Sequence, residues 1–217
     1  ILKKIKNFIF ISSDKAVNPK SILGYTKKFG EILSRHYFIL NNLKKKNYSF
    51  TIVRFGNVIG SSGSVIPIFL NQIKNKLPLT VTNVKAHRYF MSISEAVQLV
   101  INASYLNKIG IKIFALNMGK QINIYQIAKR IISLSGYSLK NKKNTSGDVE
   151  IKIVGLKKGE KLYEELTLGE NLKKTNHSDI MECNEIVRLK GVTKNLKKLE
   201  NLIKNDKIYE NKESFIK

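Results

Sequence analysis

An acid and an amine stand side by side near the start of this chain, as Asp14 and Lys15. They follow the apolar run Phe-Ile-Phe-Ile at residues 8–11, which predicts a buried strand. Open α/β folds bind their ligands at the carboxyl ends of such strands. An acid and a lysine at that edge could act in proton transfer, provided that their surroundings tune them for it. Taken alone, an Asp-Lys pair is more often a surface ion pair.

A second amine, Lys27, lies about one turn into the helix predicted after this segment. Side chains four residues apart share one face of a helix, so Leu23 and Lys27 lie together. We expect Lys27 to face back toward the edge that carries Asp14 and Lys15. Leucine cannot move a proton, so this face offers a cation and no second acid or base.

A glycine- and serine-rich loop, residues 54–64, follows the next predicted strand. Glycine lets a backbone approach a ligand closely, and the amide of Asn57 can both donate and accept hydrogen bonds. The serines at residues 61–64 stand where a helix begins, a place where amides and hydroxyls can hold an anion. The loop therefore predicts contact with a sugar or phosphate, the alternative being an ordinary loop and helix cap.

Alternating strands and helices must position these side chains. The expected strands are residues 7–12, 50–53, 79–82, 113–116 and 150–154, and the expected helices are 23–46, 65–76, 95–108 with Ser94 as cap, 123–135, 161–166 and 194–206. The first two strands are separated by a helix long enough for a crossover, so they should be parallel. The polar residues 138–148 are expected to be a flexible excursion. We predict an α/β protein, with the late strands of a Rossmann-type parallel sheet and a smaller α/β substrate-binding domain.

The chain has 217 residues and a net charge of +23, which raises the question of nucleic-acid binding. Nearly all of the positive charge is lysine, scattered among Asn and Ile, whereas base readout and phosphate forks favour arginine. We therefore expect no specific nucleic-acid partner, only a weak affinity for polyanions. The single cysteine, Cys183, excludes an internal disulfide and fits a reducing cytoplasm. His36, His87 and His177 are not at metal-ligand spacings, so no metal is expected.

The motif Ser-Ser-Asp-Lys-Ala-Val-Asn-Pro at residues 12–19, followed by Leu-Gly-Tyr-Thr-Lys at 23–27, resembles the extended short-chain dehydrogenase/reductases. More narrowly, it resembles the CapD-like sugar-nucleotide 4,6-dehydratases of polysaccharide biosynthesis. These enzymes oxidise carbon 4 of a hexose, eliminate water across carbons 5 and 6, and reduce carbon 6. The resemblance implies that Asp14 protonates the leaving hydroxyl group and that Lys15 removes the proton from carbon 5.

The same resemblance implies a cofactor, NAD or NADP. Lys27 matches the lysine of the Tyr-x-x-x-Lys motif, which holds the nicotinamide ribose, and Ser12 and Ser13 are expected to contact the cofactor. Leu23 stands where most members carry the tyrosine that acts as the carbon 4 base. The larger, membrane-anchored dehydratases also have an apolar residue at this position, so Leu23 points to that kind.

The resemblance extends to the loop Arg-Phe-Gly-Asn-Val-Ile-Gly at residues 54–60, which implies that Asn57, Val58 and Ser64 contact the sugar nucleotide. His-Arg-Tyr-Phe-Met at residues 87–91 resembles a family segment whose arginine, here Arg88, reaches the diphosphate.

The segment Gly-Leu-Lys-Lys-Gly-Glu-Lys-Leu-Tyr-Glu-Glu at residues 155–165 resembles a further family motif. It implies that Lys157 contacts the diphosphate and that Glu160 contacts the ribose hydroxyls of the nucleotide. Lys157 replaces an arginine of the motif and Lys158 replaces a proline. Lys157 keeps the positive charge but lacks the guanidinium fork, and Lys158 lacks the rigid backbone of proline.

No Gly-x-x-Gly-x-x-Gly phosphate loop occurs in the chain, so we expect it to be the carboxyl-terminal part of a larger enzyme. Residues 1–78 would end the NAD(P)-binding domain, and residues 79–217 would mainly bind the nucleotide sugar, with some segments returning to the sheet. The expected substrate is a UDP-sugar, above all UDP-N-acetylglucosamine. We expect a homo-oligomer whose catalytic part is cytoplasmic, either free or at the inner face of the membrane through a preceding anchor. The alternatives are another reductase of the superfamily such as a UDP-sugar 4-epimerase, an inactive remnant, and a basic polyanion-binding protein.

Overall fold

The computed structural model describes residues 5–42, 48–61, 63–167, 172–185 and 191–204. The helices are α1 (Ile22–Asn42), α2 (Val65–Lys74), α3 (Ile93–Leu106), α4 (Ile124–Leu134) and α5 (Val192–Lys204). The strands are β1 (Asn7–Ile11), β2 (Ser49–Arg54), β3 (Asn57–Val58), β4 (Leu79–Val81), β5 (His87–Arg88), β6 (Phe90–Met91), β7 (Gly110–Leu116), β8 (Ile122–Asn123), β9 (Leu139–Lys140), β10 (Val149–Ile153), β11 (Leu172–Lys174) and β12 (Ile180–Cys183).

The larger sheet has the strand order β1-β2-β7-β12-β11. β1, β2 and β7 are parallel, with Phe10 opposite Ile52 and Ile52 opposite Ile113. Every residue of β2 is buried, as expected for a parallel strand that is covered on both faces. β12 and β11 continue the sheet in antiparallel pairing. The predicted parallel part is confirmed, and the sequence did not predict the two antiparallel strands.

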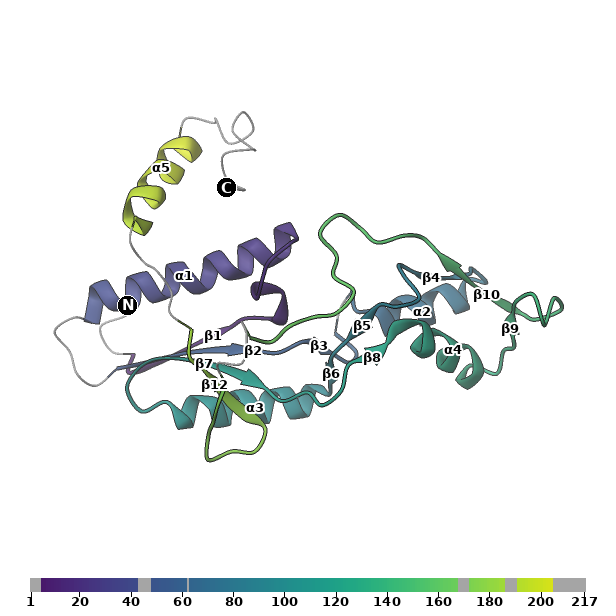
Figure 1. The fold of residues 1–217 in the computed structure, drawn as a ribbon, viewed down its shortest axis with the longest axis horizontal. Helices are drawn as coiled ribbons and strands as arrows, with labels where there is room; N and C mark the ends of the chain where they lie inside the picture. Colours follow the sequence, from purple (N-terminus) through teal and green to yellow (C-terminus); the bar gives the residue numbers. More distant parts are fainter. Residues whose placement is uncertain (1–4, 43–47, 62, 168–171, 186–190, 205–217) are drawn as a thin grey trace.

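α1 and α3 cover opposite faces of this sheet (Figure 1). Successive side chains of a strand point to opposite faces of the sheet, so the side chains of β2 belong to two different hydrophobic clusters. Ile52 packs with Phe50 and Ile113 on one side, and Val53 packs with Ala103 of α3 on the other. Among the described residues, β1 is an edge strand of this sheet, and its Phe8 is 40% exposed.

A smaller, parallel sheet of order β4-β10-β9 forms the second part of the molecule, with α2 and α4 beside it (Figure 1). Its core contains Phe69 of α2, Leu79 of β4 and Ile132 of α4. β7, β11 and β12 lie in the larger sheet although they belong to the second half of the sequence. The domain boundary at residue 78 stays a prediction.

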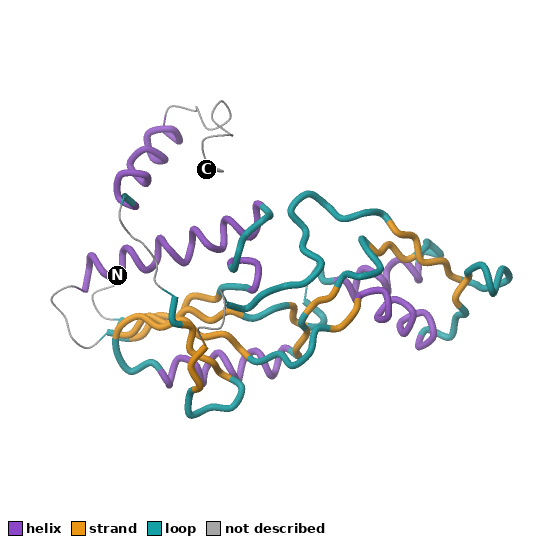
Figure 2. Tube along the Cα trace, viewed as in Figure 1, coloured by secondary structure: helices purple, strands orange, loops and turns teal. Residues whose placement is uncertain are grey.

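The segment after β10, residues 154–167, runs from the smaller part back to the start of α1 as an irregular loop (Figure 2). The helix predicted for residues 161–166 is wrong. The backbone of Glu164 pairs instead with the side chain of Gln121, and the carbonyl group of Leu162 accepts a hydrogen bond from the amide of His87. Contacts with other elements thus replace the helical hydrogen bonds.

Two smaller expectations are also corrected, the second of them in part. Ser92, not Ser94, caps α3, because its hydroxyl and Glu95 form a reciprocal capping box. Residues 138–148 are not wholly irregular, since β9 pairs with β10 and Asn141 and Asn144 form a bridge across a tight turn, while the flexibility expected there stays a prediction.

Candidate functional site

The acid and the amine lie where β1 ends. The backbone amide of Ser12 donates to Val53 and that of Asp14 donates to Phe55, so the second strand and its extension fix this segment. Asp14 then opens a short 3₁₀ turn, Asp14–Ala16, which Ser13 caps. Asp14 is fully buried, so the fold places an ionisable group inside the protein at the carboxyl edge of the sheet.

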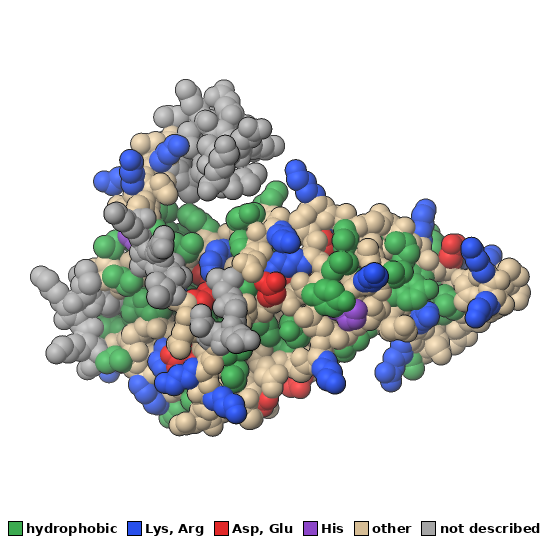
Figure 3. Space-filling view, viewed as in Figure 1, with side chains coloured by type: hydrophobic (Ala, Val, Ile, Leu, Met, Phe, Trp, Pro, Cys, Tyr) green, Lys and Arg blue, Asp and Glu red, His purple; other side chains and the backbone are tan. Residues whose placement is uncertain are grey.

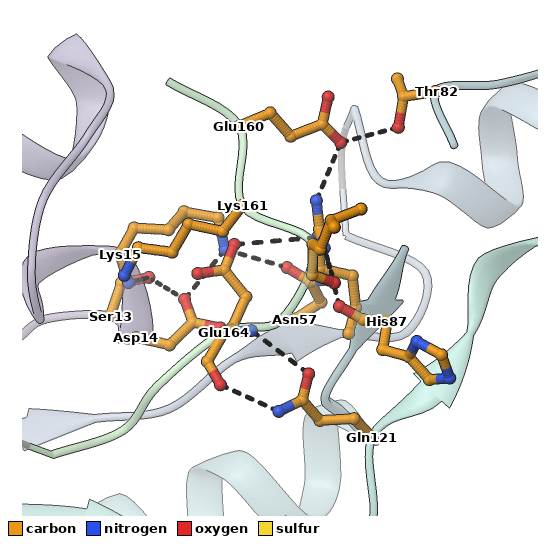
Figure 4. A network of polar contacts seen from close by, with 12 residues as sticks. Ser13, Asp14, Lys15, Asn57, Thr82, His87, Gln121, Glu160, Lys161 and Glu164 are labelled. Atoms are coloured by element: carbon orange, nitrogen blue, oxygen red, sulfur yellow. Dashed lines mark hydrogen bonds and ion pairs between the residues drawn. The ribbon is translucent and has the colours of Figure 1, made fainter. Parts of the chain in front are cut away.

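Lys15 connects this acid to the glycine-rich loop (Figure 4). Its Nζ lies 2.9 Å from Oδ1 of Asp14 and 3.2 Å from Oδ1 of Asn57. The hydroxyl of Ser13 donates to the same Asp14 oxygen at 2.8 Å. The side chain of Lys15 is 27% exposed and that of Asp14 is not exposed. The amine can therefore meet a ligand while it is held by the buried acid.

Gly56 explains how the loop comes so close to the acid. A Cβ atom at this position would lie 2.7 Å from Cβ of Tyr89 and 3.0 Å from Oδ2 of Asp14. Only glycine fits without a shift of these atoms. Within the described part of the chain, Oδ2 of Asp14 has no hydrogen-bond partner. This oxygen is itself buried, so it is also shielded from solvent.

The predicted cofactor residues have different surroundings. Ser12 is buried, and its hydroxyl donates to Oε1 of Glu31 at 2.6 Å, so this hydroxyl is engaged inside the protein. Lys27 is partly exposed and forms no ion pair with the described residues, whereas its neighbour Lys28 lies 3.7 Å from Oε2 of Glu31. Lys27 and Ser13 therefore fit a cofactor at this edge better than the Ser12 side chain does.

Arg88 and Glu160, both predicted to bind the nucleotide, lie against each other. Nη2 of Arg88 donates to Oε1 of Glu160 at 2.8 Å, and the hydroxyl of Thr82 donates to the same oxygen. Oε2 of Glu160 accepts from the backbone amide of Lys157 at 3.2 Å, while Lys157 itself is exposed. The structure thus brings these three predicted residues together at the irregular loop.

The remaining predicted contacts belong to the loop after β2. Val58 lies in β3, which pairs with β6, and is partly buried. Ser64 is the N-cap residue of α2 but makes no capping hydrogen bond with its side chain. Its hydroxyl is buried and has no hydrogen-bond partner among the described residues. A polar group of a ligand could take that place.

Glu164 lies in the motif at residues 155–165 but is not among the residues predicted to bind or react. Glu164 is buried, and Oε1 lies 3.7 Å from Nε of Arg88 (Figure 4). Burial and the charge of Asp14 raise the pKa of Glu164, against the lowering effects of Lys15, Arg88 and Lys161. The sequence shows two adjacent carboxyl groups, Glu164 and Glu165, but it does not show which of them faces inward.

Lys and Arg side chains are spread over the face seen in Figure 3 and are not gathered in one patch. The described residues contain no group of three side chains suited to hold a metal ion. None of the helices in the described ranges is long and apolar enough to cross a membrane.

A mixed sheet whose three parallel strands carry this acid–lysine pair at their carboxyl edge, with a lysine on the next helix, fits an extended short-chain dehydrogenase/reductase. A family model described as "Polysaccharide biosynthesis protein" matches residues 1–185. The chain therefore belongs to this family, the CapD-like group of polysaccharide biosynthesis proteins.

Three relatives illustrate the relationship. The chain is 48% identical over 161 residues to the probable polysaccharide biosynthesis protein EpsC of Bacillus subtilis, covering 74% of this chain and 25% of EpsC. It is 47% identical over 163 residues to the capsular polysaccharide biosynthesis protein CapD of Staphylococcus aureus, covering 75% and 25%. An uncharacterized membrane protein of Methanocaldococcus jannaschii is 42% identical over 174 residues, covering 78% and 49%. The chain thus spans between a quarter and half the length of these relatives.

Solved structures agree with the fold. Pen from Bacillus thuringiensis superimposes with a TM-score of 0.68 at 33% identity, covering 87% of this chain and 55% of Pen. The UDP-glucuronic acid 4-epimerase of Bacillus cereus, in complex with UDP-glucuronic acid and NAD, has a TM-score of 0.57 at 21% identity, covering 75% and 54%. The second likeness concerns the fold alone.

Proposed function

We propose that this chain is the catalytic-helix and substrate-binding part of an NAD(P)-dependent 4,6-dehydratase that acts on a UDP-sugar in the synthesis of a surface polysaccharide or glycan. The observation that carries the proposal is the arrangement of Lys15, whose Nζ lies between the buried carboxyl group of Asp14 and the amide oxygen of Asn57. Elimination of water needs a base for the proton on carbon 5 and an acid for the hydroxyl group on carbon 6. This arrangement supplies both within one hydrogen-bonded group.

In the proposed reaction, the 4-keto group of the oxidised sugar acidifies the proton on carbon 5, and Lys15 removes it. Asp14 gives a proton to the hydroxyl group that leaves carbon 6 as water. Asn57 accepts a hydrogen bond from Lys15 and so orients its Nζ.

NAD or NADP, when bound, supplies the oxidation at carbon 4 and the matching reduction at carbon 6. Lys27 would hold the ribose next to the nicotinamide, because it matches the lysine of the Tyr-x-x-x-Lys motif and is partly exposed at this edge. Ser13 lies at the same edge, where its hydroxyl also orients Asp14. Structural neighbours of this chain bind NAD, which supports this choice of cofactor.

The nucleotide part of the substrate would lie against Arg88, Lys157 and Glu160, with Asn57, Val58 and Ser64 nearer the sugar. A guanidinium group suits a diphosphate, and a carboxylate suits the two hydroxyl groups of a ribose. UDP-N-acetylglucosamine is the substrate that we propose first. The catalytic part would work in the cytoplasm as a homo-oligomer, and the membrane protein among the relatives supports an anchored form.

The competing enzyme function is a UDP-sugar 4-epimerase. Leu23 favours the dehydratase through the resemblance, because the larger dehydratases also carry an apolar residue at this position, whereas oxidation at carbon 4 needs a base other than Leu23 in either enzyme. An epimerase also has no use for an acid that protonates a hydroxyl group on carbon 6. The Asp14–Lys15 pair therefore favours elimination.

The test uses the chain joined to the nucleotide-binding half of a relative, so that the cofactor can bind. Incubation with UDP-N-acetylglucosamine should give a product that is lighter by one water, detected by mass spectrometry. A product of unchanged mass with inverted carbon 4 would support the epimerase instead. Absence of either product with UDP-sugars would favour an inactive remnant.

A further inference from the structure

The irregular loop 154–167 carries a carboxyl group into the interior. Glu164 is 6% exposed, whereas both of its neighbours, Tyr163 and Glu165, are exposed. Burial of a carboxyl group is costly unless nearby charges or hydrogen bonds compensate for it. The position of Glu164 therefore calls for a reason beyond packing.

The fold fixes the backbone of this residue from two sides. The side-chain amide of Gln121 accepts from the amide of Glu164 at 3.2 Å and donates to its carbonyl group at 2.9 Å. Nζ of Lys161 donates to the carbonyl group of Val17 at 2.6 Å and ties the loop to the segment after the Asp14–Ala16 turn. Glu164 is thus held in place beside the acid–lysine pair.

The carboxyl group of Glu164 is directed toward Asp14 and Lys15 (Figure 4). Oε1 lies 3.7 Å from Nε of Arg88, and Oε2 has no hydrogen-bond partner in the described residues. Oδ2 of Asp14 is likewise buried without a partner there. Asp14 and Glu164 are therefore two nearly fully buried carboxyl groups near Lys15, each with one oxygen that has no hydrogen-bond partner in the described residues.

The charged groups that act on Glu164 come from each segment that surrounds it. Asp14 and Lys15 belong to the turn after β1, Arg88 belongs to β5, and Lys161 belongs to the loop itself. Burial is the largest effect and raises the pKa of Glu164, and Asp14 adds to it. A change of charge on Glu164 is consequently felt both by the acid–lysine pair and by Arg88.

We propose that Glu164 is a positioning residue of the Asp14–Lys15 centre, which couples this centre to Arg88 and sets the pH range in which the centre works. The inference rests on the proposed dehydratase function. Glu164 itself transfers no proton to the sugar in this account. Glu164 acts through its charge on Asp14 and Lys15, the groups that transfer protons.

The test uses the chain joined to the nucleotide-binding half of a relative, which we call the completed enzyme. It compares the pH dependence of dehydration by this enzyme with and without the substitution Glu164→Gln. A carboxylate favours the protonated form of any acid or base beside it. Because the pKa of Glu164 is raised, its charge acts on the alkaline side, and its removal should therefore move the alkaline limb of the pH–rate profile of kcat to lower pH by about one unit, the lower end of the effect of a close charge. A residue with only a structural role would lower kcat at every pH and leave the profile in place.

Glu165→Gln is the matched control, because Glu165 is adjacent, exposed and bound only to Asn18 at 2.7 Å in the described structure. It should keep the wild-type profile. Thermal unfolding shows whether the Glu164→Gln protein is folded. The variant Glu164→Asp keeps the charge and should therefore have a pH–rate profile close to that of the wild type. Identical profiles for wild type and Glu164→Gln would overturn the inference while leaving the dehydratase function intact. A wild-type enzyme that releases no dehydrated sugar would overturn both.

Discussion

Arg54 and Glu31 form a bidentate ion pair inside the protein, with Nε and Nη2 of Arg54 2.7 and 2.6 Å from the two oxygens of Glu31. Arg54 is fully buried and also binds Glu185, which follows β12. Burial lowers the pKa of Arg54, but the hydrogen bonds and charges of the two carboxylates outweigh it and the net shift is upward. Ser12, two residues before Asp14, donates to the same Glu31. The pair thus connects α1, β2 and the antiparallel side of the sheet.

Replacement of Arg54 by methionine should therefore be strongly destabilising. The change leaves Glu31 and Glu185 buried with the more distant Lys28, whose Nζ lies 3.7 and 3.5 Å from them, and removal of one partner of a buried ion pair typically costs about 3–5 kcal/mol. Arg130→Met, on the exposed face of α4, is the control and should change the free energy of unfolding by no more than about 0.5 kcal/mol. Urea unfolding measures both. Equal stabilities of the two variants would show that the buried pair contributes little.

The thiol of Cys183 should be unreactive in the native protein. Burial raises the pKa of its thiol to about 12, so almost no reactive thiolate is present at neutral pH. An aromatic disulfide reagent at pH 7.5 should leave the thiol intact until denaturant is added, when it should react completely. Rapid reaction of the folded protein would mean that the thiol is accessible.

Much of the larger sheet could be predicted because its strands are strongly apolar. The runs that became β1, β2 and β7 stand out in the sequence, and a long helix between the first two requires a crossover. β11, Leu172–Lys174, offers no such signal, because a short strand with two lysines is defined by its pairing with β12 and not by its own pattern.

The candidate site was predictable to a similar degree. Asp14, Lys15 and Asn57 could be expected together, because each follows the end of a parallel strand. The inward position of Glu164 could not, since the run Lys-Leu-Tyr-Glu-Glu-Leu at residues 161–166 favours a helix on its own. Gln121 decides the outcome by binding the backbone of Glu164, and such a contact between distant segments leaves no local pattern.

Binding to DNA should be weak in spite of the net charge of +23. Lysines spread over the surface attract phosphates without reading bases, and their attraction falls steeply with salt. A fluorescence anisotropy titration should show binding that is independent of sequence at low salt and lost at about 0.15 M, where screening acts within about 8 Å. Sub-micromolar binding that selects one sequence at this salt concentration would contradict the prediction.

The central claim is that Lys15 removes the proton from carbon 5, and a single-turnover assay in deuterated water tests it most directly. The assay compares the completed wild-type enzyme with Lys15→Ala and with the control Lys74→Ala at the exposed end of α2, and it follows deuterium at carbon 5 beside the nicotinamide absorbance. Loss of a general base typically costs about 10²–10⁴-fold. Lys15→Ala should therefore still oxidise carbon 4 but should take up deuterium at least about 100-fold more slowly, with no dehydrated sugar, while Lys74→Ala should match the wild type. Deuterium uptake at the wild-type rate in Lys15→Ala would contradict the account and assign the base to another group.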